Sequence, residues 1–372
     1  MKDFFSGCQL AAALLLVSAG AVGAEFCATT GEQLQARLND AEINGEADTI
    51  RLAQGTYVSG ADGFTFDTRN NPNGDDFGVT IIGGWTSFFG NPCGQQLSPD
   101  PLDTLLDGEQ MHRTLRLFLN DAPSVEVTIK NLSFINGATT SAGGGLFIGP
   151  ETITANIRIE NNLFLLNEAS QGAALFIESA DIIRIRNNAF SNNHSTSNSA
   201  VGPLRSVTTG IYFTNNTVIN NTTELQKISR NPPSGLTINV ESPAQSFVAN
   251  NIFWNNQFDD LTLVDIPSAG TIYLYNNNIQ KMTGMADESA NNVAIDPQFE
   301  TGLVDFLLSD QSPMIDAGLN DPFVVPMPPI PFELDWQLGS FDILSNERRS
   351  GDEVDIGAHE VVSPLIFADG FE

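Results

Sequence analysis

The stretch "NNLFLLNE" at 161–168 decides the fold, because the chain repeats it several times. Close copies read "NNAFSNNH", "NNTVINNT" and "NNIFWNNQ", and two weaker copies read "NLSFING" and "NNNIQ". The first asparagines of these copies are Asn131, Asn161, Asn187, Asn215, Asn250 and Asn276. An internal repeat with a period of roughly 20–50 residues is typical of solenoids, in which each repeat forms one coil.

The residues before each first asparagine alternate between apolar and other side chains. Two residues before it stand Ile129, Ile159, Ile185, Phe213, Val248 and Leu274. Four residues before it stand Val127, Ile157, Ile183, Ile211, Ser246 and Ile272. A period of two with one apolar face predicts a strand that ends at the asparagine.

Two further apolar positions complete the repeat. Three residues after each first asparagine stand Phe134, Phe164, Phe190, Val218, Phe253 and Ile279, which predicts a second short strand. A third apolar run lies between copies, as in "GGGLFI" at 143–148, "GAALFIES" at 172–179 and "GLTINV" at 235–240. Helical periodicity is absent from this region. We therefore predict an all-β fold, a single right-handed parallel β-helix, in which each strand pairs with its copy in the next coil.

This architecture explains the repeated asparagines. A bend at the same place in every coil puts the first asparagines in one column, where their amides can donate and accept hydrogen bonds along the stack. Asparagine also tolerates the left-handed backbone of a sharp turn. Asn131 and Asn215 start N-x-S/T sequons, but the turn accounts for them without glycosylation.

The N-terminal part predicts export and a capped end. Residues 1–24 have an early Lys2, an apolar run and small residues at the end, which is the pattern of a cleaved signal peptide. No later segment has about 18 consecutive apolar residues, so we expect no transmembrane helix. Within 25–60, "TTGEQLQARLNDAEING" at 29–45 predicts a short amphipathic helix with Thr30 as its N-cap, followed by a first coil that starts at 48–57. We expect this helix to cover the N-terminal end of the solenoid, and the coils of the solenoid to span residues 61–300.

Two cysteines remain after the leader, Cys27 and Cys93. In an oxidising compartment they predict one disulfide, and two separate buried thiols are the alternative.

The charge balance bears on partners. The chain has 372 residues and a formal charge of −29, from 45 acidic and 16 basic residues. This excess argues against nucleic acid and against anionic ligands held by bulk electrostatics.

The C-terminal part carries short motifs that interrupt the repeat. They are "IDPQF" at 295–299, "DFLLSDQSPMIDAG" at 305–318 and "EVDIGAHE" at 353–360. Together with "TIRLAQGTY" and "VTIIGGW" near the start, they resemble secreted pectin-lyase-like β-helix proteins with a choice-of-anchor Q domain. The asparagine repeats are also similar to those of polymorphic outer-membrane proteins.

The resemblance implies a secreted or surface-displayed β-helix. It implies that 301–363 is an anchor-like segment, and we expect Asp355 and Glu360 in it to close the C-terminal cap by hydrogen bonds. The tail at 364–372 is either a sorting signal read by export or anchoring machinery, or a frayed acidic end.

A catalytic site is not recognisable in the sequence. The outward strand positions of the repeats carry no cluster of acids for a calcium-dependent lyase or a glycoside hydrolase. His112, His194 and His359 have no metal-ligand spacing, and no phosphate-binding loop or nucleophile elbow occurs. We expect no catalytic residues, metal or cofactor, and keep a polysaccharide-active enzyme as the alternative to a binding module.

One outward column suggests a binding surface for a polysaccharide or cell-surface glycan. Three residues before the first asparagines lie Arg158, Arg184, Tyr212, Phe247 and Tyr273. Alternation places them opposite the interior, and aromatic rings with arginines can stack on sugars and bond their hydroxyls. We predict that these five residues bind carbohydrate. The alternative is that a long loop, such as 222–234, covers them.

Overall fold

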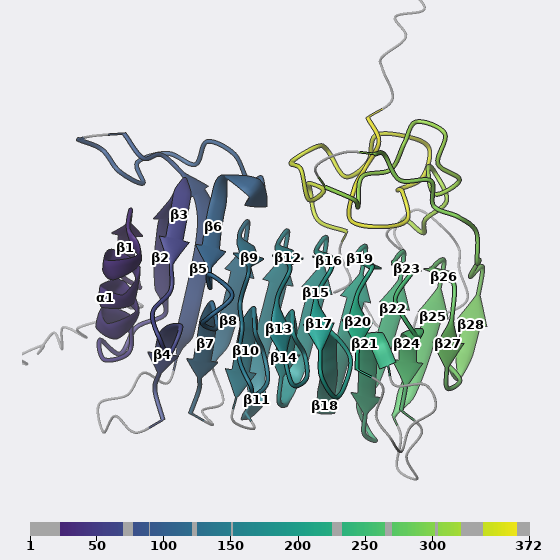
Figure 1. Cartoon of the computed structure of the whole chain (residues 1–372), viewed down its shortest axis with the longest axis horizontal. Coiled ribbons are helices and arrows are strands. Elements are labelled where there is room, and N and C mark those ends of the chain that lie inside the picture. Colours follow the sequence, from purple (N-terminus) through teal and green to yellow (C-terminus); the bar gives the residue numbers. More distant parts are fainter. Residues whose placement is uncertain are drawn as a thin grey trace, which may run out of the picture.

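The structure is a computed structural model that describes residues 23–69, 77–88, 90–120, 125–149, 152–224, 233–264, 270–301, 304–320 and 338–362. These residues wind into one right-handed parallel β-helix, as the repeat predicts (Figure 1). Nearly all of the expected signal peptide at 1–24 and all of the tail at 364–372 lie outside the described residues.

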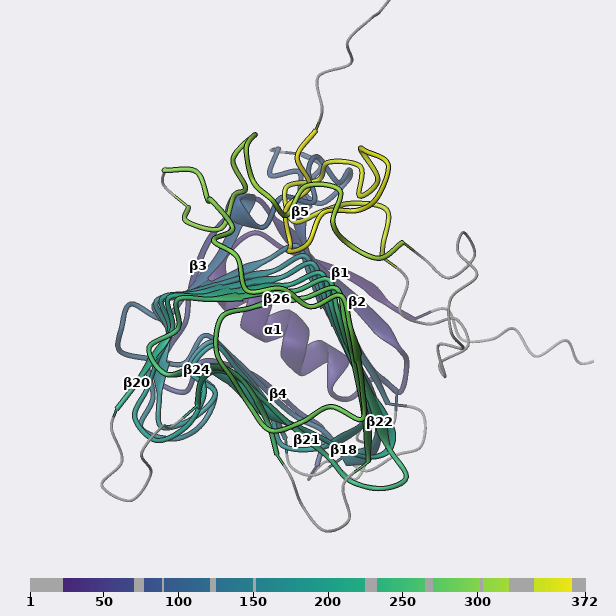
Figure 2. The same cartoon turned by 90° about the vertical axis from the view of Figure 1, so that its right-hand side faces the viewer.

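Each coil contributes strands to three faces, which surround the interior (Figure 2). The first face consists of the strands that end at the asparagine turns, preceded by two strands of the first coils that are followed by Gln54 and Thr86. They are β2 (Asp48–Ala53), β5 (Gly78–Trp85), β8 (Glu126–Lys130), β11 (Thr152–Glu160), β15 (Ala180–Arg186), β18 (Val201–Thr214), β22 (Gln245–Ala249), β25 (Thr271–Tyr275) and β28 (Glu288–Ala290).

The second face follows the turns and consists of β3 (Gly55–Val58), β6 (Thr104–Asp107), β9 (Ser133–Ile135), β12 (Leu163–Leu165), β16 (Ala189–Ser191), β19 (Thr217–Ile219), β23 (Ile252–Trp254) and β26 (Asn278–Ile279). A short helical turn, η1 (Pro101–Asp103), leads into β6. At the corner after this face lies a small parallel sheet of β13 (Glu168–Ala169), β17 (His194–Ser195) and β20 (Thr222–Thr223).

The third face closes the coil. It consists of β4 (Phe64–Asp67), β7 (Leu115–Phe118), β10 (Leu146–Gly149), β14 (Leu175–Ile177), β21 (Pro233–Val240), β24 (Asp259–Leu263) and β27 (Met282–Thr283). The long strand β18 serves two faces, because Val201 pairs with β14 and Gly210–Thr214 pair with β15.

The N-terminal end is closed by a helix, as the sequence predicts. Helix α1 (Gly31–Ala41) lies across the end of the interior (Figure 2) and buries Leu34, Leu38 and Ala41. The Thr30 side chain accepts a hydrogen bond from the Gln33 N–H, which is the expected N-cap. Strand β1 (Glu25–Ala28), which the sequence analysis did not predict, precedes the helix and pairs with β2.

The predicted disulfide is confirmed. Cys27 of β1 is bonded to Cys93, so the strand before the lid is joined to the segment 86–100 that follows β5. The bond closes a long loop of chain, which restricts the unfolded state by an amount that grows slowly with loop length.

The interior is filled by the predicted apolar columns, which run through successive coils. The rings of Phe134, Phe164 and Phe190 stack with centroid distances of 4.7 and 4.8 Å, and each ring is fully buried. In the next coil Val218 takes this position, and the ring of Phe213 from the first face lies between Phe190 and Phe253. Uniform coil spacing puts equivalent side chains of neighbouring coils in contact, which favours large apolar residues at these positions.

The asparagines divide their roles in a way that corrects the prediction. The first asparagine of each copy takes the left-handed backbone as expected, with φ between 48° and 59° from Asn276 to Asn131. However, the inner amide ladder runs through the second asparagine of the copies, and its members are Asn162, Asn188, Asn216, Asn251, Asn277 and finally Asn292. The reversal of the backbone at the first residue turns the next side chain inward.

Each rung of this ladder has the same chemistry. The backbone N–H and the Nδ2 of Asn188 both donate to Oδ1 of Asn216, and each donor–acceptor distance is 3.0 Å. The Nδ2 also donates to the Ile159 carbonyl of the preceding coil. Buried turn groups are therefore satisfied by the amides of neighbouring coils, which is required because an unpaired buried polar group is costly.

A second ladder lies at the next corner and ends in a carboxylate. Its amides are Asn167, Asn193, Asn221 and Asn256. Both the N–H and Nδ2 of Asn256 donate to Oδ1 of Asp260, while Oδ2 of Asp260 accepts the N–H of Lys281. The last position needs two acceptors, which a carboxylate has and an amide lacks.

The change Asp260→Asn tests this ending. The NH₂ group of the new asparagine would face one of the N–H donors that Asp260 now accepts, from Asn256 or from Lys281. We therefore expect the free energy of unfolding to fall by about 2 kcal/mol at pH 7. Burial raises the pKa of Asp260 to about 6. Because the folded-state pKa is raised, the wild type gains stability from this group as the pH falls from about 7 towards 4, and the variant does not. Denaturation of both proteins across that range checks the difference, and parallel profiles would contradict it.

The C-terminal segment, here residues 304–320 and 338–362, lies along the side of the β-helix and does not cap its end (Figure 1). The first asparagines hold it there. Asn187 Nδ2 donates to the carbonyls of Leu338 and Phe341 at 3.0 Å, and Asn250 Nδ2 donates to the Leu319 carbonyl at 2.9 Å. We expected Asp355 and Glu360 to close the C-terminal end of the β-helix. This expectation is wrong, because the segment that carries them packs on the side of the β-helix (Figure 1).

Asp355 and Glu360 instead surround a buried arginine within this segment. Arg348 is 1 % exposed, and its Nη2 donates to the carbonyls of Asp355 and Gly357 at 2.8 and 2.7 Å. Its Nη1 lies 3.6 Å from the Glu360 carboxylate. Burial lowers the pKa of Arg348 and raises the pKa of Glu360 to about 7, while the charge of each residue favours the charged form of the other.

Candidate functional site

The predicted outward column exists as a column. Arg158, Arg184, Tyr212, Phe247 and Tyr273 are consecutive partners in the register of the first face. They lie on the opposite side of the strands from the apolar interior, as alternation requires.

The expectation that these residues face solvent is wrong for four of the five. Arg184, Tyr212 and Tyr273 are 7–8 % exposed, and Phe247 is fully buried, while Arg158 is half-buried. The cover among the described residues is the C-terminal segment, because Leu319, Leu338 and Val354 pack with the three aromatic rings. Residues 225–232 of the loop that was expected to cover the column lie outside the described residues. The outward rings thus form a second apolar layer, and carbohydrate binding by this column stays an untested prediction.

A large open hollow lies elsewhere, at the corner between the second and third faces near the helical lid. Two adjoining hollows of about 550 and 500 Å³ share Ala61, Asp62 and Arg116, and together form one groove. We call it the corner groove. It runs from Glu32 on α1 over the loop at 59–63 to Thr139, Thr140 and Glu168. It crosses the first four coils, about 15 Å at the spacing of parallel strands.

Arg113 forms the rigid part of one wall. Its Nε donates to the Gly143 carbonyl at 2.7 Å, and its Nη2 donates to the Ala142 carbonyl at 2.7 Å and to Ser141 Oγ at 2.8 Å. Burial and the neighbouring charge of Arg116 lower the pKa of Arg113 to about 10. The guanidinium therefore remains protonated at neutral pH, and serves as a fixed cation and not as a proton acceptor.

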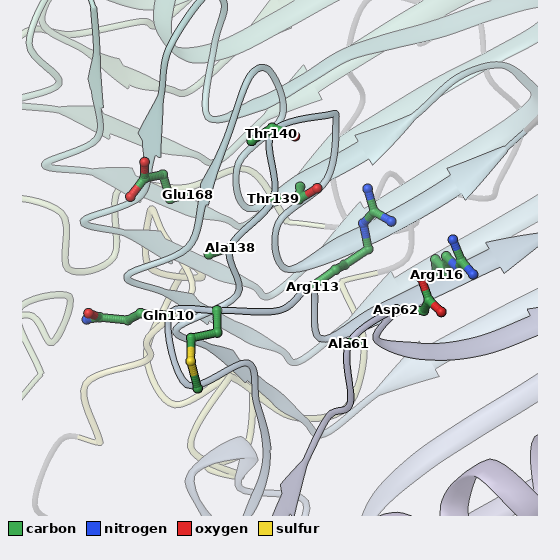
Figure 3. A pocket seen from close by; sticks show the side chains of 10 residues that line it. Ala61, Asp62, Gln110, Arg113, Arg116, Ala138, Thr139, Thr140 and Glu168 are labelled. Carbon is green, nitrogen blue, oxygen red and sulfur yellow. The ribbon is translucent and has the colours of Figure 1, made fainter.

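Arg116 is the more available cation of the groove. It lies on β7, and its Nε donates to Thr65 Oγ1 at 3.0 Å. Its two Nη atoms donate to none of the residues that the structure describes. Figure 3 shows Arg113, Arg116 and Asp62 gathered towards one end of the hollow, with Gln110 and Glu168 towards the other. The guanidinium of Arg116 can therefore form bidentate bonds to a ligand.

The rest of the lining is mixed. Gln110, Thr139 and Thr140 offer amide and hydroxyl groups, and Met111 and Val58, which are 63 % and 47 % exposed, offer apolar surface. The acids of the groove are Glu32, Asp62 and Glu168. Amides, hydroxyls and charged planar groups around a small apolar surface match the hydroxyl-rich edges and apolar faces of sugars.

The described residues show neither a metal site nor a membrane span. Among them no three His, Cys, Asp or Glu side chains gather so as to hold a metal ion. His359 accepts a hydrogen bond from the Leu308 N–H through Nδ1, so it serves the C-terminal segment. In the same part of the chain, no helix has both the length and the apolar character needed to cross a membrane.

The residues of the corner groove were missed by the sequence analysis. Many of them lie in the loops 59–63, 108–114 and 138–140, and the others lie on α1, β3, β4, β7 and β13. The one sequence signal is the presence of Arg113 and Arg116 three residues apart in an acidic chain.

The comparisons with known proteins are sparse. No protein-family model matches the sequence, and no curated protein matches it. Among solved structures, the chain is similar to the crystal structure of pectate lyase Pel9A, at 11 % identity and a TM-score of 0.35. The similarity covers 92 % of this chain and 97 % of that one. At this level it says nothing about what the present chain binds.

Proposed function

We propose that this protein is an exported or surface-displayed β-helix that binds extended polysaccharide in the corner groove. The observation that carries the proposal is the groove itself, which is open, crosses several coils and is lined by sugar-compatible groups. The choice-of-anchor resemblance and the leader-like N-terminus support the location of the protein, and the role of the C-terminal tail remains part of that proposal.

The geometry favours binding over the enzymatic alternative. Arg113 is held by three hydrogen bonds and has a pKa of about 10, so it stays protonated at neutral pH and is not suited to remove a proton from a sugar. The groove does contain the carboxylates of Asp62 and Glu168, which keeps a hydrolase as the second candidate.

The variant Arg116→Gln tests the groove. It removes the charge and the bidentate donor but keeps a polar side chain, so we expect affinity for the bound polysaccharide to fall about tenfold, or about 1.4 kcal/mol. The wild type is first assayed against a panel of neutral and acidic polysaccharides by affinity electrophoresis. The measurement is then the dissociation constant for the best ligand by calorimetry.

Arg37→Gln is the matched control, because Arg37 lies on α1 outside the groove and pairs with Asp40. Equal affinities of the two variants would contradict the proposed site. New reducing ends or unsaturated products in the same mixtures would replace the binding proposal with the enzymatic one.

A further inference from the structure

A second hollow lies on the side of the molecule that carries the C-terminal segment. It has a volume of about 230 Å³ and lies between the segment 86–100, at Gln96 and Pro99, and the C-terminal segment at 339–341. We call it the side cleft. Both segments rise from the same side of the β-helix (Figure 1). The floor of the cleft consists of Lys130, Asn131, Glu160, Asn161, Arg186 and Asn187.

The asparagines of the floor belong to a column that already binds carbonyl oxygens. Asn161 Nδ2 donates to the Asp342 carbonyl at 3.3 Å, and Asn276 Nδ2 donates to the Ala317 carbonyl at 3.1 Å. Asn131 is the next member of the column beyond the C-terminal segment. It is 4 % exposed, yet its side-chain amide bonds to none of the described residues.

Asn187, the third asparagine of the floor, is already engaged by the C-terminal segment. Its Nδ2 donates to the Leu338 and Phe341 carbonyls, and a Cβ at Gly339 would lie 3.2 Å from this Nδ2, so the glycine lets the segment lie close. Its Oδ1 accepts no hydrogen bond from any described residue but is buried. The Asn131 amide is therefore the asparagine group that the cleft offers to a ligand.

Among the charged residues of the floor, Lys130 forms no ion pair with a described residue. Lys130, Glu160 and Arg186 are in register on three neighbouring strands. Glu160 pairs with Arg186 at 3.1 Å. In the described part of the chain, Lys130 has no carboxylate within ion-pair distance. An ammonium group next to an unbonded amide donor is suited to a carboxylate.

We propose that the side cleft binds a small molecule with a carboxylate. The carboxylate lies against Lys130 and the Asn131 amide. A sugar acid and an N-acylated amino acid both carry such a group, and the cleft is of a size for one such unit. This site is independent of the corner groove.

The test uses two variants that preserve the backbone. Lys130→Met removes the charge, and Asn131→Gly removes the amide while allowing the positive φ of 59°. Their controls are Lys281→Met, which removes an equal charge elsewhere, and Asn276→Gly, which changes the same column far from the cleft. The probes are glucuronate, N-acetylglycine, inorganic phosphate and glucose, titrated into the whole protein and followed by backbone amide shifts in NMR.

We expect saturable binding of at least one carboxylate probe, with shifts at 130–131, 160–161 and 186–187. Lys130→Met and Asn131→Gly should each weaken it at least fivefold, and the two controls should not. Tighter binding of glucuronate identifies the sugar acid as the ligand class, and tighter binding of N-acetylglycine identifies the acylated amino acid. Binding of phosphate alone, binding of glucose with equal affinity, or no carboxylate binding at 50-fold excess over protein overturns the proposal. Arg116 lies outside the side cleft, so Arg116→Gln should leave the affinities for the carboxylate probes unchanged.

Discussion

Phe164→Ala is expected to lower the free energy of unfolding by about 3–5 kcal/mol. Phe164 is fully buried and stacks between Phe134 and Phe190, with interplanar angles of 7° and 11°. The substitution removes the apolar burial and two ring contacts. The cavity cannot collapse, because the coils above and below are fixed by strand pairing and by the asparagine ladders.

Phe88→Ala is the matched control, since Phe88 is 69 % exposed and should change stability by less than about 0.5 kcal/mol. Urea denaturation of both variants measures the effect. Repeat proteins can unfold in stages, so hydrogen exchange at 127–135, 157–165 and 183–191 should locate the loss. Equal stability of the two variants would show that the ring column does not hold the coils together.

Arg348→Met is expected to release the C-terminal segment from the side of the β-helix. The variant leaves Glu360 and Asp355 buried without their cation and leaves the Gly357 carbonyl without its donor. Breaking one member of a buried ion pair costs about 3–5 kcal/mol. The loss falls on the segment that Arg348 organises, so the coils should keep their stability.

Limited proteolysis and hydrogen exchange of 338–362 measure this effect, and Arg349→Met, an exposed neighbour, is the control. Release of the segment should also expose Tyr212, Phe247 and Tyr273, which increases tyrosine accessibility to solvent probes. If protection of the segment were the same in both variants, the ion pair would not be what fixes it.

Much of the fold was predictable because its signals are local and repeated. Alternation around Asn161, Asn187 and Asn215 defines the strands of two faces, and the Thr30 cap defines the start of α1. The two roles of adjacent asparagines were not predictable in the same way. Which of two neighbouring amides points inward depends on the backbone of the first, and composition does not reveal it.

The candidate site was less predictable, for a physical reason. Alternation states that Tyr212 and Phe247 lie opposite the interior, but it cannot state whether another part of the chain lies over them. Here that part is more than 60 residues away in sequence, as the bond between Asn250 and Leu319 shows. The corner groove depends on loops such as 59–63 and 108–114, whose paths follow no period.

The ladders give the β-helix a direction that matters for shortening or extending it. In every rung, the backbone N–H and one Nδ2 hydrogen of a coil point to the side-chain oxygen of the following coil, while the other Nδ2 hydrogen points to a carbonyl of the preceding coil. A chain cut after any internal coil would leave two hydrogens without an acceptor, whereas a cut before it would leave one oxygen and one hydrogen. A C-terminal truncation therefore needs a terminator that accepts, as Asp260 does for the second ladder. An internal coil, by contrast, can be removed whole, since its neighbours present the matching halves of the same bond.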